Sequence, residues 1–166
     1  MRSQPGPDYL SSDDVVTPPS LARAILEHLR PSGRLLEPCC GSRDSFLQFM
    51  PGADWCEITR GRDFFAYGGH VDWIITNPPW SKIRSFLSKA MRVADNVAFL
   101  ITINHVWTKA RLRDVTCAGF HIAEIVLCPS PREFPSSGFQ LGVVLFRRGP
   151  SPGSIKFSTL SWVDYD

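Results

Sequence analysis

Apolar and polar positions along the chain follow two periods, one typical of helices and one typical of strands. A helix is predicted after Pro18 and Pro19, with Thr17 as its N-cap. Its apolar positions, at helical spacing, are Leu21, Ile25, Leu26 and Leu29. Further helical segments are expected at residues 45–50, 82–93 and 109–118. Runs rich in β-branched residues predict strands at residues 34–37, 54–58, 71–76, 97–103, 122–127 and 141–146. Because strands alternate with helices, we predict an α/β domain with a mostly parallel sheet.

Length and composition favour one ordinary globular domain. The chain has 166 residues, 43% of them hydrophobic and 20% charged, which argues against a disordered, collagen-like or coiled-coil protein. Residues 1–16 are polar and contain prolines, so we expect a flexible arm, or one ordered by a ligand, followed by a single domain at residues 17–166. The longest uncharged apolar run, residues 97–103, is far shorter than the roughly 20 residues that span a bilayer.

Cysteine usage and the N-terminal sequence favour a cytoplasmic protein. The five cysteines are an odd number without the spacing of a zinc site, so we expect reduced thiols and no metal. The N-terminus shows no apolar segment after its early arginine, and we therefore expect no secretory signal. No partner spacing suggests a metal or catalytic role for the histidines at positions 70, 105 and 121.

Charge is distributed unevenly along the chain. Residues 1–79 contain 7 basic and 10 acidic residues, whereas residues 80–166 contain 11 basic and 6 acidic ones. The second half could therefore present a basic face to a phosphate backbone, although this surplus alone is too small to predict nucleic-acid binding.

Ligands of open α/β sheets bind beyond the carboxyl ends of the strands, so residues directly after the predicted strands are the first candidates for a site. The segment Glu37-Pro38-Cys39-Cys40-Gly41 follows the first strand. Its carboxylate could hold a positively charged ligand group, and its glycine would allow a ligand to approach the backbone. The alternative is a tight turn between a strand and a helix.

Acidic and aromatic residues also follow the second strand. Glu57 lies 20 residues after Glu37, where an acid of a nucleotide-binding α/β fold contacts ribose hydroxyls. Asp63 could accept a hydrogen bond from an adenine amino group, and Phe64 or Phe65 could cover the adenine ring. The alternatives are a solvated glutamate and phenylalanines in the core; we expect one phenylalanine to belong to the core.

The tetrad Asn77-Pro78-Pro79-Trp80 is the most specific motif. Two prolines make the backbone stiff and donate no hydrogen bond, so the Asn77 side-chain oxygen and the Pro78 carbonyl could accept both hydrogens of one planar amino group. Trp80 could stack on a base, a contact worth about 1–3 kcal/mol. The alternative is a proline-rich turn with a buried tryptophan.

Taken together, these motifs resemble the class I S-adenosylmethionine-dependent amino-methyltransferases, from about Val16 to Phe146. The resemblance implies a Rossmann-like sheet, mostly parallel with one antiparallel strand, and S-adenosylmethionine as the cofactor. It implies Asn77, Pro78, Pro79 and Trp80 as catalytic residues. The cofactor-binding residues that it implies are Thr17, Pro18, Glu37, Pro38, Cys39, Gly41, Glu57, Asp63, Phe64 and Asn77.

Two features depart from this family's pattern. Arg43 stands where a second glycine is usual, so the loop is one residue longer or the cofactor pocket is altered. Only 14 residues separate Glu57 from Asp72, and we therefore expect a sheet trimmed near its third strand.

By the resemblance, the expected activity is methyl transfer to the N6 amino group of adenine in DNA. An RNA adenine, a protein glutamine and a non-catalytic, methyltransferase-like nucleic-acid-binding subunit are the alternatives. No separate target-recognition domain fits in the chain, so residues 130–140, the N-terminal arm or a partner subunit would have to recognise the target. Residues expected to line a phosphate track, unless they are merely solvated, are Lys82, Arg84, Lys109 and Arg111.

Overall fold

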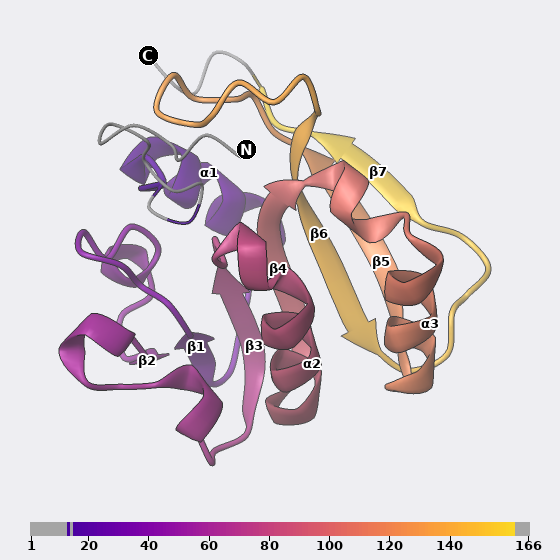
Figure 1. The fold of residues 1–166 in the computed structure, drawn as a ribbon, viewed down its shortest axis with the longest axis horizontal. Coiled ribbons are helices and arrows are strands. Elements are labelled where there is room, and N and C mark those ends of the chain that lie inside the picture. The colour runs from indigo at the N-terminus through magenta and orange to yellow at the C-terminus, as the bar shows by residue number, and fades with distance from the viewer. Residues whose placement is uncertain (1–12, 14, 162–166) are drawn as a thin grey trace, which may run out of the picture.

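A seven-stranded sheet organises the computed structural model, which describes residue 13 and residues 15–161 (Figure 1). The strands lie in the order β2-β1-β3-β4-β6-β5-β7. Their bounds are β1 Leu35–Glu37, β2 Asp54–Trp55, β3 Val71–Thr76, β4 Ala94–Thr102, β5 Phe120–Leu127, β6 Leu141–Arg148 and β7 Lys156–Thr159. Only β6 runs antiparallel to its neighbours β4 and β5, whereas the other pairs are parallel. The predicted sheet, mostly parallel with one antiparallel strand, is confirmed.

Among the described residues, three α-helices cover the two faces of this sheet. Helices α2 (Ile83–Val93) and α3 (Lys109–Cys117) pack with one apolar cluster, and α1 (Pro19–Leu29) packs with a second cluster. The two clusters lie on opposite faces of the sheet because successive side chains of a strand point to opposite faces. On β4, Phe99 belongs to the first cluster and its neighbour Leu100 to the second. The central strands are therefore buried on both sides, which explains their nearly continuous apolar sequence.

Short 3₁₀ turns lie in the connections between successive strands. They are η1 Leu47–Phe49, η2 Ile58–Arg60, η3 Phe64–Ala66, η4 Trp80–Lys82 and η5 Ile103–Val106. Residues 56–70 between β2 and β3 form η2 and η3 and contribute no strand to the sheet. The expected trimming near the third strand is therefore confirmed.

Several element boundaries differ from those predicted. Helix α1 begins at Pro19 after Pro18, no side chain caps it, and Thr17 is buried instead of acting as the N-cap. The segment 45–50 contains a 3₁₀ turn, and the predicted strand 54–58 ends at Trp55, because Glu57 caps η2 with its side chain. The sequence did not predict β7.

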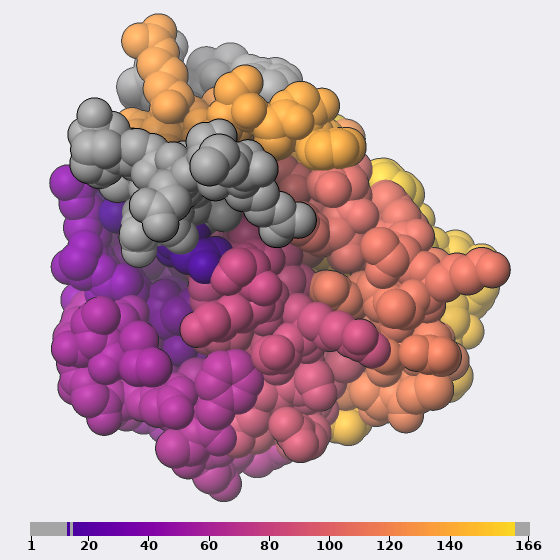
Figure 2. All heavy atoms as spheres, viewed as in Figure 1, coloured from indigo at the N-terminus to yellow at the C-terminus, as the bar shows by residue number. Residues whose placement is uncertain are grey.

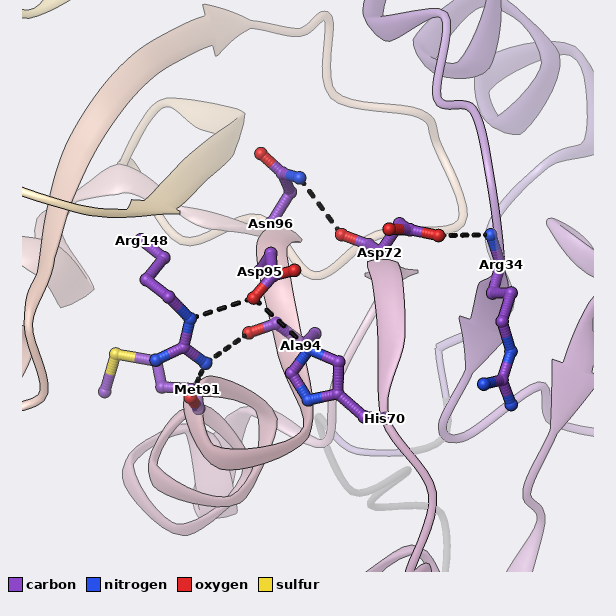
Figure 3. Close-up of polar contacts among 8 residues, drawn as sticks. All are labelled: Arg34, His70, Asp72, Met91, Ala94, Asp95, Asn96 and Arg148. Atoms are coloured by element: carbon purple, nitrogen blue, oxygen red, sulfur yellow. Dashed lines mark hydrogen bonds and ion pairs between the residues drawn. The ribbon is translucent and has the colours of Figure 1, made fainter.

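A polar network ties the strands together at their amino ends, opposite the loops described below (Figure 3). Arg148 Nε donates to Asp95 (2.9 Å), and its Nη2 donates to the carbonyls of Met91 and Ala94 (3.0 Å each). Asp95 also pairs with His70 at 3.2 Å. These bonds link the end of α2 to β4 and β6. Side-chain hydrogen bonds therefore stabilise this end of the sheet.

The five cysteines differ in exposure. Cys40, Cys56 and Cys128 are buried, Cys39 is partly buried, and Cys117 on α3 is exposed; all five are free thiols. In the part of the chain that the structure describes, no cluster of three or more histidine, cysteine or acidic side chains could hold a metal ion. Among the same residues, no helix is long and apolar enough to cross a membrane.

Candidate functional site

A cavity of about 550 Å³ opens at the carboxyl ends of β1, β2 and β3. It lies where the surface is hollowed between the purple and magenta segments (Figure 2). We call it the first cavity. The predicted site residues that line it are Thr17, Glu37, Pro38, Cys39, Gly41, Glu57, Asp63, Phe64, Asn77, Pro79 and Lys82. Pro18 and Pro78, also predicted, lie outside its lining, and Pro78 is buried.

Glu37 places a buried carboxyl group at the wall of the first cavity. Its side chain is 1% exposed, and its Oε1 accepts a hydrogen bond from the Thr76 hydroxyl (2.5 Å). The other oxygen, Oε2, is buried and has no hydrogen-bond partner among the described residues. Burial raises the pKa of Glu37 to about 8, although the Thr76 hydrogen bond acts in the opposite direction. This carboxyl therefore has an oxygen free to accept a hydrogen bond, and a cationic partner would strongly stabilise its ionised form.

Glu57, the expected ribose acid, also organises the loop after β1. The Gly41 amide donates to its Oε2 (2.9 Å), and the Thr59 amide and hydroxyl donate to its Oε1 (3.1 and 2.8 Å). Burial opposes the ionised form of Glu57, but these hydrogen bonds outweigh it and lower the pKa of the carboxyl. Oε1 accepts two hydrogen bonds and Oε2 only one, so Oε2 keeps an unused lone pair and Glu57 can both support the loop and accept from a ligand hydroxyl.

The loop between these acids has an unusual backbone. Gly41 has φ +66°, a left-handed conformation that suits glycine, and Asp44 adopts φ +50°. Arg60 stabilises the loop, because it donates to the Gly41 carbonyl (2.5 Å) and pairs with Asp44. Arg43 is exposed and lines the first cavity. The position where a second glycine is usual thus contributes a positive charge.

Aromatic side chains form the wall near Asp63. The Asp63 carboxylate caps η3 by accepting from the Phe65 amide (2.9 Å). Phe64 is 2% exposed and belongs to the core, as expected for one of the two phenylalanines, yet it also lines the first cavity. Phe65 is 44% exposed, and its ring meets that of Phe86 edge to face at 5.2 Å between centroids. This part of the cavity therefore presents aromatic ring surface beside a carboxylate that can accept a hydrogen bond.

The tetrad begins at the end of β3. Asn77 Nδ2 donates to the Val15 carbonyl (3.2 Å), and Asn77 Oδ1 accepts from the Trp80 indole N–H (3.1 Å). These two bonds fix which way the amide faces. A further contact comes from Asp13, which accepts from the Ser81 amide (2.9 Å) and hydroxyl (2.5 Å). Of the predicted N-terminal arm, only residues 13, 15 and 16 are described, and residues 13 and 15 bind the tetrad segment.

Trp80 faces a second cavity of about 370 Å³. Its ring packs beside Phe134 (6.0 Å) and His105 (6.3 Å), and Phe139, 57% exposed, lines the same cavity. The residues around this cavity are Trp80, Thr102, Leu141 and most of the loop between β5 and β6: Ser130, Pro131, Arg132, Phe134, Pro135, Ser136, Ser137, Gly138 and Phe139. Asn77 and Pro79 line the first cavity, so the tetrad lies between the two cavities.

The four basic residues predicted to line a phosphate track differ in exposure and in ion pairing. Lys82 is exposed and lines the first cavity. Arg84 is engaged in a two-fold ion pair with Asp114 (2.7 and 3.1 Å), and Lys109 is exposed at the start of α3. Arg111 is partly buried. Among the described residues, the ion pairs at these four positions involve Arg84 alone, and the phosphate track stays a prediction.

Several lining residues were missed from the sequence. Ile58 directly follows the strand-end acid, a position that would have suggested it. For Phe86, one turn into α2, no sequence signal exists, because the side that a helix turns to a cavity depends on packing. The lining residues that the sequence did not single out are Asp13, Val15, Val16, Ser42, Ser45, Phe46, Ile58, Thr59 and Phe86.

Solved structures share this fold, although no protein-family model and no curated protein matches the sequence. A Listeria monocytogenes protein assigned to the class I S-adenosylmethionine-dependent methyltransferases matches with a TM-score of 0.65 at 14% identity, over 96% of this chain and 69% of that one. An RNA methyltransferase candidate from Pyrococcus horikoshii matches with a TM-score of 0.57 at 14% identity, over 87% and 92%.

The M protein of the type I restriction enzyme EcoKI also matches, with a TM-score of 0.60 at 15% identity, over 87% of this chain and 46% of that one. The chain thus spans about half the length of this protein. These likenesses show that the chain has the fold of class I S-adenosylmethionine-dependent methyltransferases.

Proposed function

We propose that this protein is an S-adenosylmethionine-dependent methyltransferase that acts on the N6 amino group of adenine in DNA. The observation that carries the proposal is the position of the tetrad between two cavities: Asn77 and Pro79 line the first, and Trp80 lines the second. Methyl transfer needs a donor and an acceptor held on either side of one reacting centre, and the tetrad stands at such a boundary.

The first cavity fits the proposed cofactor in charge and shape. The unpartnered oxygen of Glu37 suits the α-ammonium group, Glu57 suits the ribose hydroxyls, and Asp63 suits the adenine amino group. Apolar contacts to the adenine ring would come from Phe64, Phe65 and Phe86. When bound, the cofactor supplies an electrophilic methyl group on a sulfonium. Cavity residues that complete the proposed site are Thr17, Pro38, Cys39, Gly41 and Asn77.

The second cavity would receive the target base. Trp80, Phe134 and Phe139 offer aromatic surface on which an adenine can stack, a contact worth about 1–3 kcal/mol for each base. In a duplex, the target adenine has to leave the base stack before it can enter such a cavity. Sequence recognition in this proposal comes from the loop at residues 130–140 or from a partner subunit.

Asn77 would act on the amine directly. Its Nδ2 is held by the Val15 carbonyl, which leaves Oδ1 as an acceptor with two lone pairs, one of them used by Trp80. An adenine amino group that donates to this oxygen gains electron density as positive charge develops on nitrogen. Asn77 would thereby orient the nitrogen toward the methyl group that a bound cofactor would supply, and the methylated amine would release one proton to solvent.

Methyl transfer from labelled cofactor tests the proposal. The full chain is incubated with duplex DNA, single-stranded DNA and structured RNA, and the nucleosides are separated by mass spectrometry. We expect N6-methyladenine in DNA. Methyl found only in RNA, on cytosine or on protein glutamine would assign a different substrate. Calorimetry that gives no heat at cofactor concentrations near 1 mM, a dissociation constant equivalent to about −4.1 kcal/mol, would contradict the proposal for this chain.

The variant Asn77→Ala isolates the role of the tetrad. We expect the turnover rate to fall by about 10²–10³, because one preorganised hydrogen-bond partner of the transition state is worth that much, and the cofactor affinity to fall far less, because Asn77 is one of many residues that line the first cavity. Asn96→Ala is the matched control, since Asn96 lies at the opposite end of the sheet, where it bonds to Arg147 and to the Asp72 carbonyl. Full activity of Asn77→Ala would show that the tetrad is only a turn.

A further inference from the structure

Unpartnered buried polar atoms concentrate at two places in the described part of the chain. One is the Oε2 atom of Glu37 at the first cavity; the other three atoms are Oδ1 of Asn104 and both Nε and Nη1 of Arg111. Asn104 belongs to η5 at the end of β4, and Arg111 lies in the first turns of α3. A buried charged donor without a partner costs about 1–3 kcal/mol or more, so it calls for an explanation.

No acidic side chain neutralises Arg111 among the described residues. The nearest candidate on its own helix is Asp114, but both oxygens of that carboxylate accept hydrogen bonds from Arg84. Arg111 forms no ion pair, and burial, together with the charge of Arg84, lowers its pKa despite the attraction of Asp114. The surroundings of this guanidinium therefore favour the arrival of an anion.

The start of α3, where Arg111 lies, packs against η5 (Ile103–Val106), the turn that carries His105. Burial and the charge of Arg111 lower the pKa of His105. The His105 ring lies 6.3 Å from that of Trp80, which lines the second cavity. The turn that contacts the start of α3 thus also carries the ring that lies beside the tryptophan proposed to receive the base.

We propose that Arg111 binds a backbone phosphate of the nucleic acid next to the base that enters the second cavity, and this inference rests on the proposed function. The Arg111 side chain is only partly buried, so a rotation about its aliphatic stem brings the unpartnered N–H groups to the surface. A guanidinium matches two phosphate oxygens in one plane, which makes arginine the preferred residue for such a contact. In the free protein, N–H groups of Arg111 lack hydrogen-bond acceptors, and the phosphate of the bound nucleic acid supplies them.

Salt dependence of oligonucleotide binding tests this assignment without cofactor or catalysis. Binding of a short single-stranded oligodeoxynucleotide with one adenine is followed by fluorescence anisotropy from about 50 to 200 mM salt. For Arg111→Gln we expect weaker binding and a slope of log K against log salt that is smaller by about 0.7, the value of one lost phosphate contact on a single strand. Arg92→Gln, an exposed arginine in the last turn of α2, is the matched control and should keep the wild-type slope.

A chemical substitution in the DNA identifies the phosphate. When the linkages beside the adenine are neutral methylphosphonates, wild type should lose the affinity that Arg111→Gln loses, and the variant should lose little more. If the affinity lost through Arg111→Gln and the affinity lost through the methylphosphonates simply add, the inference is overturned. An unchanged salt slope for Arg111→Gln, or no oligonucleotide binding by wild type, would overturn it as well. A chain that methylates DNA while failing this test refutes only the phosphate site, and a chain that binds no cofactor can still pass it.

Thermal unfolding separates a ligand-binding role from a structural one. Because an uncompensated buried charge is often replaced by an apolar residue at no cost, we expect Arg111→Met to melt at or above the wild-type temperature while losing the phosphate contact. A lower melting temperature together with unchanged oligonucleotide affinity would assign Arg111 to the fold alone.

Discussion

At the scale of single residues, Glu37 is the most buried charged residue in the described part of the chain, and one of its carboxyl oxygens has no hydrogen-bond partner there. Burial raises its pKa to about 8 from an ordinary value of 4.5. The folded state therefore holds a proton that the unfolded chain releases, so Glu37 contributes its full stability below about pH 4.5, and this contribution is lost as the pH rises to about 8. The free protein prefers Glu37 neutral, whereas a bound ammonium group prefers it ionised.

This conflict predicts a pH-dependent cofactor affinity. Between pH 6 and 7, most Glu37 carboxyls carry a proton that has to leave on binding, so the association constant should rise by up to about tenfold over one pH unit. Calorimetry in two buffers with different ionisation enthalpies would measure both the affinity and the released proton. In Glu37→Gln, which cannot ionise, we expect weak binding without this pH dependence.

Glu27→Gln is the control for that experiment, because Glu27 pairs with Arg23 on the exposed face of α1 and lies far from the cavity lining. Its pH profile should match that of wild type. An affinity that is flat from pH 6 to 7 in wild type would show that no proton leaves Glu37 on binding.

The sequence indicated the polar residues of the first cavity better than the apolar ones. Glu37, Glu57 and Asp63 follow strands, and strand ends converge at one edge of a parallel sheet whatever the details of packing. Phe86 could not be found in this way, since only the packing of α2 turns it toward the cavity. Pro18 was expected to contact the cofactor but lies outside the cavity lining, so a motif in sequence does not fix which of its residues reaches a ligand.

At the scale of elements, β7 shows why a short edge strand escapes prediction. It has four residues, most of them exposed, and pairs only with β5. Polar contacts from Glu124 on β5 add to this pairing: the carboxylate accepts from Ser158 (2.6 Å) and His28 (2.8 Å) and pairs with Lys156 (3.2 Å). Glu124 thereby connects α1, β5 and β7, which are distant in sequence, and local patterns carry no trace of such contacts.

Glu124→Gln should therefore destabilise the protein by about 1–3 kcal/mol, because it removes charge from a mostly buried set of hydrogen bonds. Urea unfolding at neutral pH measures the change. Burial opposes ionisation of Glu124, but hydrogen bonds from Ser158, His28 and Lys156 outweigh it and lower its pKa. Its contribution is thus present above about pH 4.5 and is lost as the pH falls through the lower folded pKa, so the difference between variant and wild type should shrink in acid.

The matched control on α1 is again Glu27→Gln. Its ion pair with Arg23 is about two-thirds exposed on both side chains, and such pairs contribute about 0–1 kcal/mol. Equal destabilisation by the two variants would mean that Glu124 does not connect the three elements.

At the scale of the whole molecule, the strands on the two sides of the sheet differ in length and in the extent of their pairing. The edge strand β2 has two residues and pairs only with β1, whereas β4 pairs over its length with both β3 and β6. Residues 56–70, which fill the place of a further strand, consist of turns and contribute several residues to the first cavity. The trimmed side of the sheet therefore carries the proposed cofactor site, while the opposite side has the longer strand pairings.

Hydrogen exchange should reveal this difference. We expect the amides of β2 and of residues 57–66 to exchange much faster than those at residues 97–101 of β4, because local opening at an edge breaks few contacts. Adding S-adenosylmethionine should slow exchange at residues 37–46 and 57–66 and leave β4 unchanged. Uniform protection across the sheet before addition, or slowing confined to β7, would contradict this view.

The uneven exposure of the cysteines makes the protein suitable for selective chemical labelling. Burial raises the pKa of Cys40 and of Cys128 to about 12 and also raises the pKa of Cys39 and of Cys56, so these thiols react slowly. Cys117 is exposed at the end of α3, the helix that carries Arg111. A maleimide fluorophore would therefore attach mainly at Cys117 and report, without any engineered cysteine, when a ligand settles against that helix.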